Sequence, residues 1–213
     1  DAEAGAGDPT DRPRTSVFTA SAGRLTAGRF DRVHRQPRRL AELTHRLAVG
    51  PAVRPSWSVA SADGGELSLV HVPGGTVSAD ETEEPIPVQE VEGVVAAIAE
   101  HVRSRPQESL AVLTVGRGMA VEVTDVLRRA LRRSPELSDW LTQPTTEPLV
   151  VTDLQHAEEL TRDHVIIALG LAHDSFGRFS HRFGILDSDH GARLLAVAVG
   201  RARHRVTLVS SLW

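Results

Sequence analysis

Three arginines, Arg201, Arg203 and Arg205, stand on alternate residues near the end of the sequence, between an apolar segment and a strand-like one. A guanidinium group held rigidly at such a junction can bind phosphate through two parallel hydrogen bonds. It can also stabilise the charge of a phosphoryl group in transfer. The simpler alternative is three solvated side chains at the end of a helix, where the helix dipole favours cations. Spacing alone favours this alternative, because clustered charges usually mark a solvated face.

The composition excludes several kinds of chemistry. Cysteine is absent from the 213 residues, which removes disulfides, zinc–thiolate sites and thiol nucleophiles. Lysine is absent too, so all 24 Lys+Arg residues are arginine, and neither a Schiff-base lysine nor a P-loop lysine is present. The net charge of -4 gives no overall attraction for nucleic acid, so such contact needs a local arginine patch. Without an apolar run of membrane-spanning length or a signal-peptide pattern, we expect no membrane span and a cytoplasmic location.

The histidines and serines do not form a recognisable catalytic or metal-binding motif. One segment combines three histidines with three aspartates: His173, Asp174, His181, Asp187, Asp189 and His190. The histidine spacings fit no short zinc signature, so no metal site is predicted. The sequence also lacks the G-x-S-x-G motif of serine hydrolases.

The elements that must position the arginines follow from apolar periodicity. It predicts strands at 66–72, 110–115, 148–153, 164–171 and 205–211, and helices at 37–48, 88–104, 118–133 and 191–203. Short apolar strands that alternate with helices indicate a parallel sheet covered on both faces, which binds ligands at the carboxyl ends of its strands. Residues 1–14 are small and acidic and read as a flexible arm or linker, and residues 15–213 as one domain. Arg201 then lies near the end of a helix.

Several segments, taken in order, resemble the motifs of superfamily 1 helicases, in particular the bacterial branch related to the nonsense-mediated-decay helicase. Near the C-terminus these are RDHVIIALG (motif V), DSFGRFSHRFGIL (a loop of this branch) and LLAVAVGRARHRVTLVSS (motif VI and the last strand of the second RecA-like domain). Upstream, the stretch that ends in HRQPRRLAEL resembles the segment with the Tyr-Arg motif, and LAVLTVGRGMAVEVTDVLRRAL resembles the surroundings of motif IV. The resemblance covers residues 16–211, nearly the whole chain.

The resemblance implies an α/β fold, a RecA-like three-layer α/β/α sandwich of the P-loop NTPase type with a mostly parallel sheet. No G-x-x-x-x-G-K-[ST] motif occurs, so this domain lacks its own P-loop. In the family, ATP with Mg binds to a first RecA-like domain of the same parent chain, and the second domain supplies arginines across the cleft. Arg201 matches the motif VI arginine, and Arg35 matches the other arginine that faces the phosphate.

Further positions take their expected roles from the same resemblance. His34, Glu159 and Gly200 align with positions beside the nucleotide. Thr114 and Thr152 end predicted strands, where hydroxyl and backbone N–H groups would contact the phosphates of single-stranded DNA or RNA without reading the sequence. Alternatively, each threonine simply ends its strand and does not bind nucleic acid. The three tryptophans are expected to pack in the core or at its edges, and aromatic residues are few, which leaves few stacking platforms for bases.

Some motif positions depart from the family pattern. His34 stands in place of a tyrosine, Gly200 in place of a threonine and Met119 in place of a glutamine. Glu158 and Glu159 occupy the Gln-Gly positions of motif V, where carboxylates would repel a triphosphate. Two functions therefore remain open. One is the C-terminal motor domain of an ATP-dependent helicase, which would not hydrolyse ATP as this chain alone. The other is a degenerate, non-catalytic helicase-like domain that acts as a scaffold or protein-interaction module.

Overall fold

The computed structural model describes residues 32–33, 36–49, 58–59, 65–73, 76–77, 86–174 and 184–211. The chain divides into two compact units, residues 1–31 and 32–213, and every described residue belongs to the second. The predicted arm at 1–14 lies outside the described residues, and so do His34, Arg35, Trp57 and Trp213. The predictions for these positions remain predictions.

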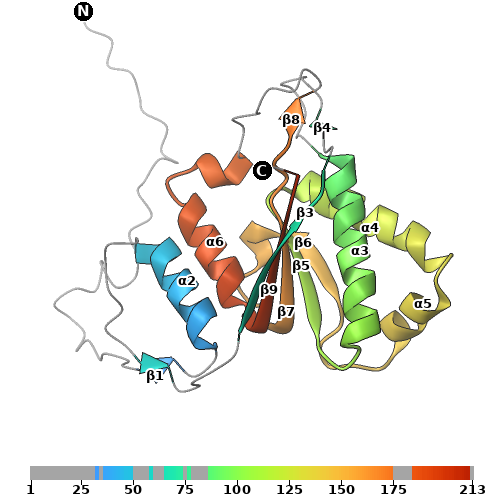
Figure 1. Cartoon of the computed structure of the whole chain (residues 1–213), viewed down its shortest axis with the longest axis horizontal. Coiled ribbons are helices and arrows are strands. Elements are labelled where there is room, and N and C mark those ends of the chain that lie inside the picture. The colour runs from blue at the N-terminus through green and yellow to red at the C-terminus, as the bar shows by residue number, and fades with distance from the viewer. Residues whose placement is uncertain are drawn as a thin grey trace, which may run out of the picture. The chain divides into compact units, whose positions relative to one another are not determined.

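Five strands form the central sheet in the order β3-β9-β7-β5-β6 (Figure 1). They are β3 (Glu66–His71), β5 (Leu110–Thr114), β6 (Val150–Asp153), β7 (Arg162–Ala168) and β9 (Ala202–Ser210). All four pairings are parallel, so the amino ends of the strands share one edge of the sheet and the carboxyl ends share the opposite edge. Two short parallel pairs lie outside this sheet: β1 (Arg32–Val33) with β2 (Ser58–Val59), and β4 (Thr76–Val77) with β8 (His173–Asp174).

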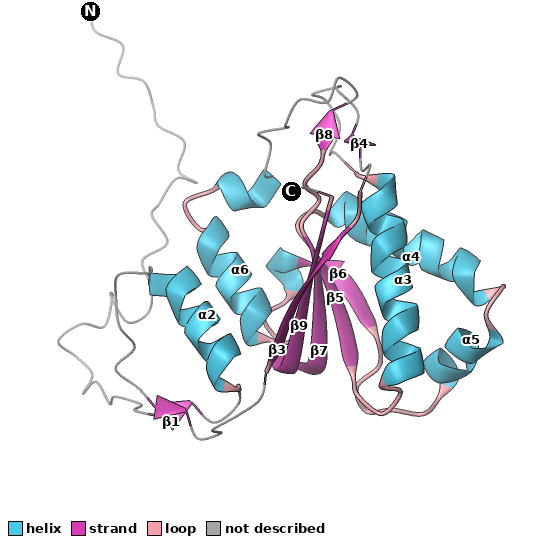
Figure 2. Cartoon of the chain, viewed as in Figure 1, coloured by secondary structure: helices cyan, strands magenta, loops and turns pink. Residues whose placement is uncertain are grey.

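Helices cover both faces of the sheet (Figure 2). On one side lie α2 (Arg38–Val49) and α6 (Gly191–Gly200); on the other lie α3 (Val88–Ser104) and α4 (Arg117–Leu131), with α5 (Pro135–Thr142) beside them. Two short 3-10 helices, η1 (Leu154–His156) and η2 (Gly184–Asp187), precede β7 and α6. The predicted three-layer α/β/α sandwich around a parallel sheet is therefore confirmed. Within the described residues, no helix is both long and apolar enough to cross a membrane.

Strand β5 shows why the buried strands read as continuous apolar runs. Leu110 and Val112 belong to the core beneath α3 and α4, whereas Ala111 and Leu113 belong to the core beneath α2 and α6. All four side chains are fully buried. Successive residues of a strand point to opposite faces, so a sheet covered on both sides needs apolar residues at every position.

Most predicted elements are confirmed to within two or three residues, and the differences that bear on the site fall at the C-terminal arginines. The predicted helix at 191–203 is too long: α6 ends at Gly200, and β9 begins at Ala202. Arg201 thus occupies a one-residue turn, and Arg203 lies in a strand. Helix α5 was not predicted from the sequence, although Ser134 accepts a hydrogen bond from the helix start and Pro135 takes the first helical position, a common N-terminal pattern.

Candidate functional site

Arg201 lies at the amino edge of the sheet, between the end of α6 and the start of β9. Its backbone N–H donates to Ala198 O (3.1 Å), and its carbonyl accepts from the N–H of Arg162 (3.0 Å). Its half-buried side chain is held at two points, because Nε donates to Val197 O (3.2 Å) and Nη1 donates to Glu158 O (2.5 Å). The guanidinium group is therefore fixed on backbone atoms. Its position differs from the general expectation for parallel sheets, in which ligands bind at the carboxyl ends.

The contact with Glu158 brings the segment before β7 and the turn after α6 together, although 43 positions separate the two residues. Glu158 and Glu159 are both exposed beside the arginine turn. Gly200 is buried, and among the described residues a Cβ placed there would meet Thr44 Cγ2, at 3.9 Å. The described neighbours therefore leave room for a small side chain at this position.

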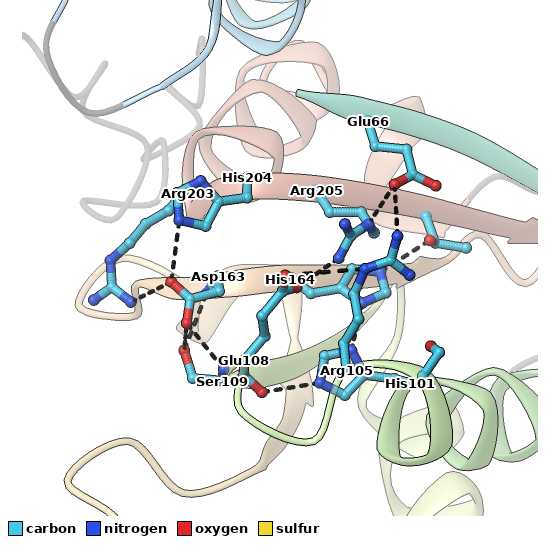
Figure 3. Close-up of polar contacts among 12 residues, drawn as sticks. Glu66, His101, Arg105, Glu108, Ser109, Asp163, His164, Arg203, His204 and Arg205 are labelled. Carbon is cyan, nitrogen blue, oxygen red and sulfur yellow. Dashed lines mark hydrogen bonds and ion pairs between the residues drawn. The ribbon is translucent and has the colours of Figure 1, made fainter. Parts of the chain in front are cut away.

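Arg203 has a different role from Arg201, and its contact with Asp163 is drawn in Figure 3. Its Nη1 donates to Asp163 Oδ1 (3.0 Å) and to Glu147 Oε2 (2.8 Å), and its Nη2 pairs with Glu147 Oε1. Ser109 joins the two carboxylates, because its hydroxyl donates to Glu147 Oε2 (2.7 Å) and its backbone N–H donates to Asp163 Oδ2 (3.0 Å). The hydrogen bond from Arg203 lowers the pKa of Glu147 to about 2. Arg203 thus links the segment before β6 to the start of β7, and Ser109 extends the cluster to the residue before β5. Arg203 therefore supports the structure rather than facing a ligand.

Arg205 forms a second ion-pair cluster at the same edge (Figure 3). Its Nε donates to Glu66 Oε2 (2.7 Å), and its Nη1 donates to Glu108 Oε2 (2.5 Å). Arg105 contacts the same two carboxylates, at 3.4 Å for Glu66 and 3.9 Å for Glu108. Only 12% of the Arg205 side chain is exposed, so this is a partly desolvated cluster that ties β3 and β9 to the α3–β5 loop. Arg203 and Arg205 are therefore both engaged in ion pairs.

Beneath this cluster, a chain of hydrogen bonds crosses the protein interior (Figure 3). The carbonyl of Glu108 can only accept, so His101 Nε2 must donate to it (2.9 Å), which leaves Nδ1 of the neutral ring as an acceptor. His164 Nδ1 then donates to His101 Nδ1 (3.0 Å), and Thr207 Oγ1 donates to His164 Nε2 (2.9 Å). Ser68 Oγ completes the chain by donating to Thr207 (2.9 Å).

The protonation of this buried pair follows from its surroundings. Burial, and then the charges of His101, Arg205 and Arg105, lower the pKa of His164 to about 3. Burial also lowers the pKa of His101. Trp140, which donates from Nε1 to Pro106 O (2.8 Å), lies edge-on against the His101 ring, so this tryptophan packs at the core edge as expected. Both histidines are neutral near pH 7 and have a structural role.

The two threonines predicted for nucleic acid lie at the carboxyl edge, opposite Arg201. Thr114 is fully buried, and its hydroxyl donates to Gly116 O (2.6 Å). Thr152 is half-buried and lines a hollow of about 380 Å³ between α4 and β6, together with Arg117, Val121 and other residues. The Thr152 side chain therefore lies at a surface hollow, whereas the Thr114 hydroxyl already has a hydrogen-bond partner inside the fold.

Two residues near this edge, Met119 and Glu90, are buried in the fold. Met119, aligned with a glutamine of motif IV, is 1% exposed and packs in the core beneath α3 and α4. Glu90 is fully buried at the start of α3, where its carboxylate accepts from the N–H groups of Gly170 (2.7 Å) and Ser211 (3.1 Å). It therefore binds the segments that follow β7 and β9. An acid within a predicted amphipathic helix gave no sequence signal for this role.

Comparisons with known proteins find similarity among solved structures. No protein-family model matches the sequence, and no curated protein matches it. Among solved structures, the chain is similar to the crystal structure of the C-terminal domain of a possible DNA helicase from Lactobacillus plantarum WCFS1. The identity is 17%, with 83% of this chain and 86% of that chain covered, and the TM-score is 0.46. A similarity of this size does not assign an activity to the chain.

Proposed function

We propose that the chain is the C-terminal motor domain of an ATP-dependent superfamily 1 helicase. Arg201, together with Arg35, would face the terminal phosphate of ATP bound with Mg on a first RecA-like domain. The positive charge would stabilise the phosphoryl group in transfer. The described residues include no lysine and no phosphate-binding glycine loop, so the nucleotide itself would be held by the partner domain.

One observation carries this proposal: Arg201 is anchored on backbone carbonyls at the amino edge, in contact with the motif V segment at Glu158. A fixed guanidinium group loses little side-chain entropy when it meets a phosphate, which favours a role in transition-state stabilisation. Arg203 and Arg205 belong to the two ion-pair clusters at the same edge. The anchoring of Arg201 supports the alignment of both motifs.

Contact with single-stranded DNA or RNA would use the opposite edge. Thr152 and the exposed Arg117 lie at the hollow beside α4, where a hydroxyl and a guanidinium can contact phosphate without reading bases. Anisotropy of a fluorescent oligothymidylate tests this with the isolated chain. Arg117→Ala should weaken binding and reduce its salt dependence, whereas Arg132→Ala, at the far end of α4, should do neither. Equal binding by the two variants would exclude this edge.

The ATPase test uses this domain assembled with its first RecA-like domain. Arg201→Ala should lower the strand-stimulated kcat by about 100-fold or more, as expected for an arginine that stabilises the transferred phosphoryl group. Arg193→Ala, an exposed arginine on the same helix, should leave kcat unchanged. A kcat for Arg201→Ala equal to that of Arg193→Ala would refute the motor function.

A second candidate function, the degenerate scaffold, is favoured by the exposed Glu158–Glu159 pair beside Arg201. Two carboxylates at this position oppose the approach of a triphosphate. Replacing both residues with the family's Gln-Gly pair separates the candidates. If the domain is an eroded motor, the double substitution should raise the ATPase rate or lower KM for ATP. If it is a scaffold, no ATPase activity should appear in either protein.

A further inference from the structure

The turn that carries Arg201 is held from the side by Gln36. The last carbonyls of a helix have no partner within the helix, and those of α6 lie in the protein interior. Gln36 Nε2 donates to Val199 O (2.8 Å) and to Ala202 O (3.1 Å). These carbonyls stand on either side of Gly200 and Arg201. Gln36 is only 6% exposed, so both bonds form away from water.

The chemistry of the position suits a primary amide. An amide nitrogen has two N–H donors, which match the two carbonyls, and its oxygen can accept from Thr44 Oγ1 of α2 (3.4 Å). A glutamate of the same shape has no donor and would place negative charge against two carbonyl oxygens. A methionine would fill the space without satisfying either carbonyl. The bonds therefore depend on the amide and not on side-chain volume alone.

These bonds restrict the placement of the Arg201 guanidinium. With the flanking carbonyls held by Gln36, and the Arg201 N–H and carbonyl paired with Ala198 and Arg162, the backbone of the turn is fixed on every side. The side chain can then reach Glu158 O from a defined starting point. Gln36 also directly follows Arg35 in the sequence. The same amide thus connects the segment that contains Arg35 to the turn that contains Arg201.

We propose that Gln36 is a positioning residue, which holds the Arg201 turn through its two amide hydrogen bonds and fixes that turn relative to the start of α2. The clamp itself is a property of this chain. Its effect on ATP turnover rests on the proposed function, since it requires that Arg201 stabilises the transferred phosphoryl group. The two statements are separable by experiment.

Hydrogen exchange of the 213-residue chain tests the clamp. Gln36→Met should speed exchange of the amides at 199–203 by about tenfold or more, the effect of losing two buried hydrogen bonds. Amides of β5, on the far side of β7, should exchange as in the wild type. Gln155→Met, at an exposed glutamine, is the matched control and should change neither segment. Gln36→Asn, which keeps the amide but shortens the side chain, provides a milder variant if Gln36→Met does not fold.

The kinetic test uses the domain assembled with its first RecA-like domain. Gln36→Met should lower kcat by about tenfold, with KM for ATP nearly unchanged, because a misplaced arginine loses transition-state interactions rather than ground-state binding. Unchanged exchange at 199–203 would overturn the inference, whatever the ATPase rate. Faster exchange with full kcat, while Arg201→Ala is inactive, would overturn positioning but keep the motor function. Faster exchange with neither variant altering kcat would keep the clamp and refute the motor function.

Discussion

Glu90 provides a sharp test of how burial sets the stability of this fold. Its carboxylate is fully buried and accepts two backbone N–H groups, but no cation pairs with it among the described ion pairs. Burial therefore outweighs these hydrogen bonds and raises the pKa of Glu90 from its ordinary value of 4.5 to about 7. The folded protein holds the proton more tightly than the unfolded chain does, so the contribution of Glu90 to stability is full below pH 4.5. It decreases as pH rises through 7.

The perturbation is Glu90→Gln, which removes the titration and keeps the size of the side chain. A pKa shift of this size changes the free energy of unfolding by about 3 kcal/mol in total. Most of it falls between pH 5 and 8, so the stability of the wild type relative to Glu90→Gln should decrease by about 2–3 kcal/mol over that interval. Urea unfolding followed by tryptophan fluorescence, at several pH values, measures this difference.

Only the difference between the two proteins is informative, because the buried histidines act in the opposite sense. The pKa of His164 is lowered to about 3, so its contribution to stability is lost as pH falls below 6.5. This loss is common to both proteins and cancels. Glu92→Gln, at an exposed position of the same helix, is the control for replacing a carboxylate with an amide on α3. A difference between the wild type and Glu90→Gln that stays constant with pH would refute the argument from burial.

Three further predictions concern the ion pairs, the core and a close backbone contact at Gly191. Because Arg203 lowers the pKa of Glu147 to about 2, Glu147→Gln should cost about 1–2 kcal/mol at pH 7 and progressively less as pH falls from 4.5 towards 2, as measured by urea unfolding. Ile166→Ala, in the fully buried centre of β7, should cost about 2–5 kcal/mol, whereas Val121→Ala, at a position 56% exposed, should stay within about 0.5 kcal/mol in the same assay. Gly191→Ala should lower the melting temperature and perturb α6, since a Cβ at this position would overlap a backbone oxygen of η2; an unchanged melting temperature would contradict this close contact.

The sequence predicted the layers because the relevant signals are local. The all-apolar β5 and the amphipathic α3 follow from side-chain periods of 2 and 3.6 residues, and α3 begins and ends where its periodicity predicts. The end of α6 was placed three residues too late, because an apolar helix that runs into a strand leaves no polar boundary between them. Arg203 was consequently assigned to the wrong element.

The sequence by itself determined the parallel sheet covered on both faces and the absence of a P-loop motif from these residues. Arg201 was chosen as the candidate phosphate-facing arginine by the resemblance to superfamily 1 helicases, since spacing alone favoured solvated arginines. Only the tertiary structure decided what surrounds that arginine. Gln36 reaches carbonyls 163 and 166 positions away, and Glu90 reaches an N–H group 121 positions away. Such partners depend on the order of strands in the sheet and on which edge each loop occupies. The apolar periodicity of the sequence does not predict such contacts. A single buried polar side chain occurs where backbone groups of the folded chain need a hydrogen-bond partner.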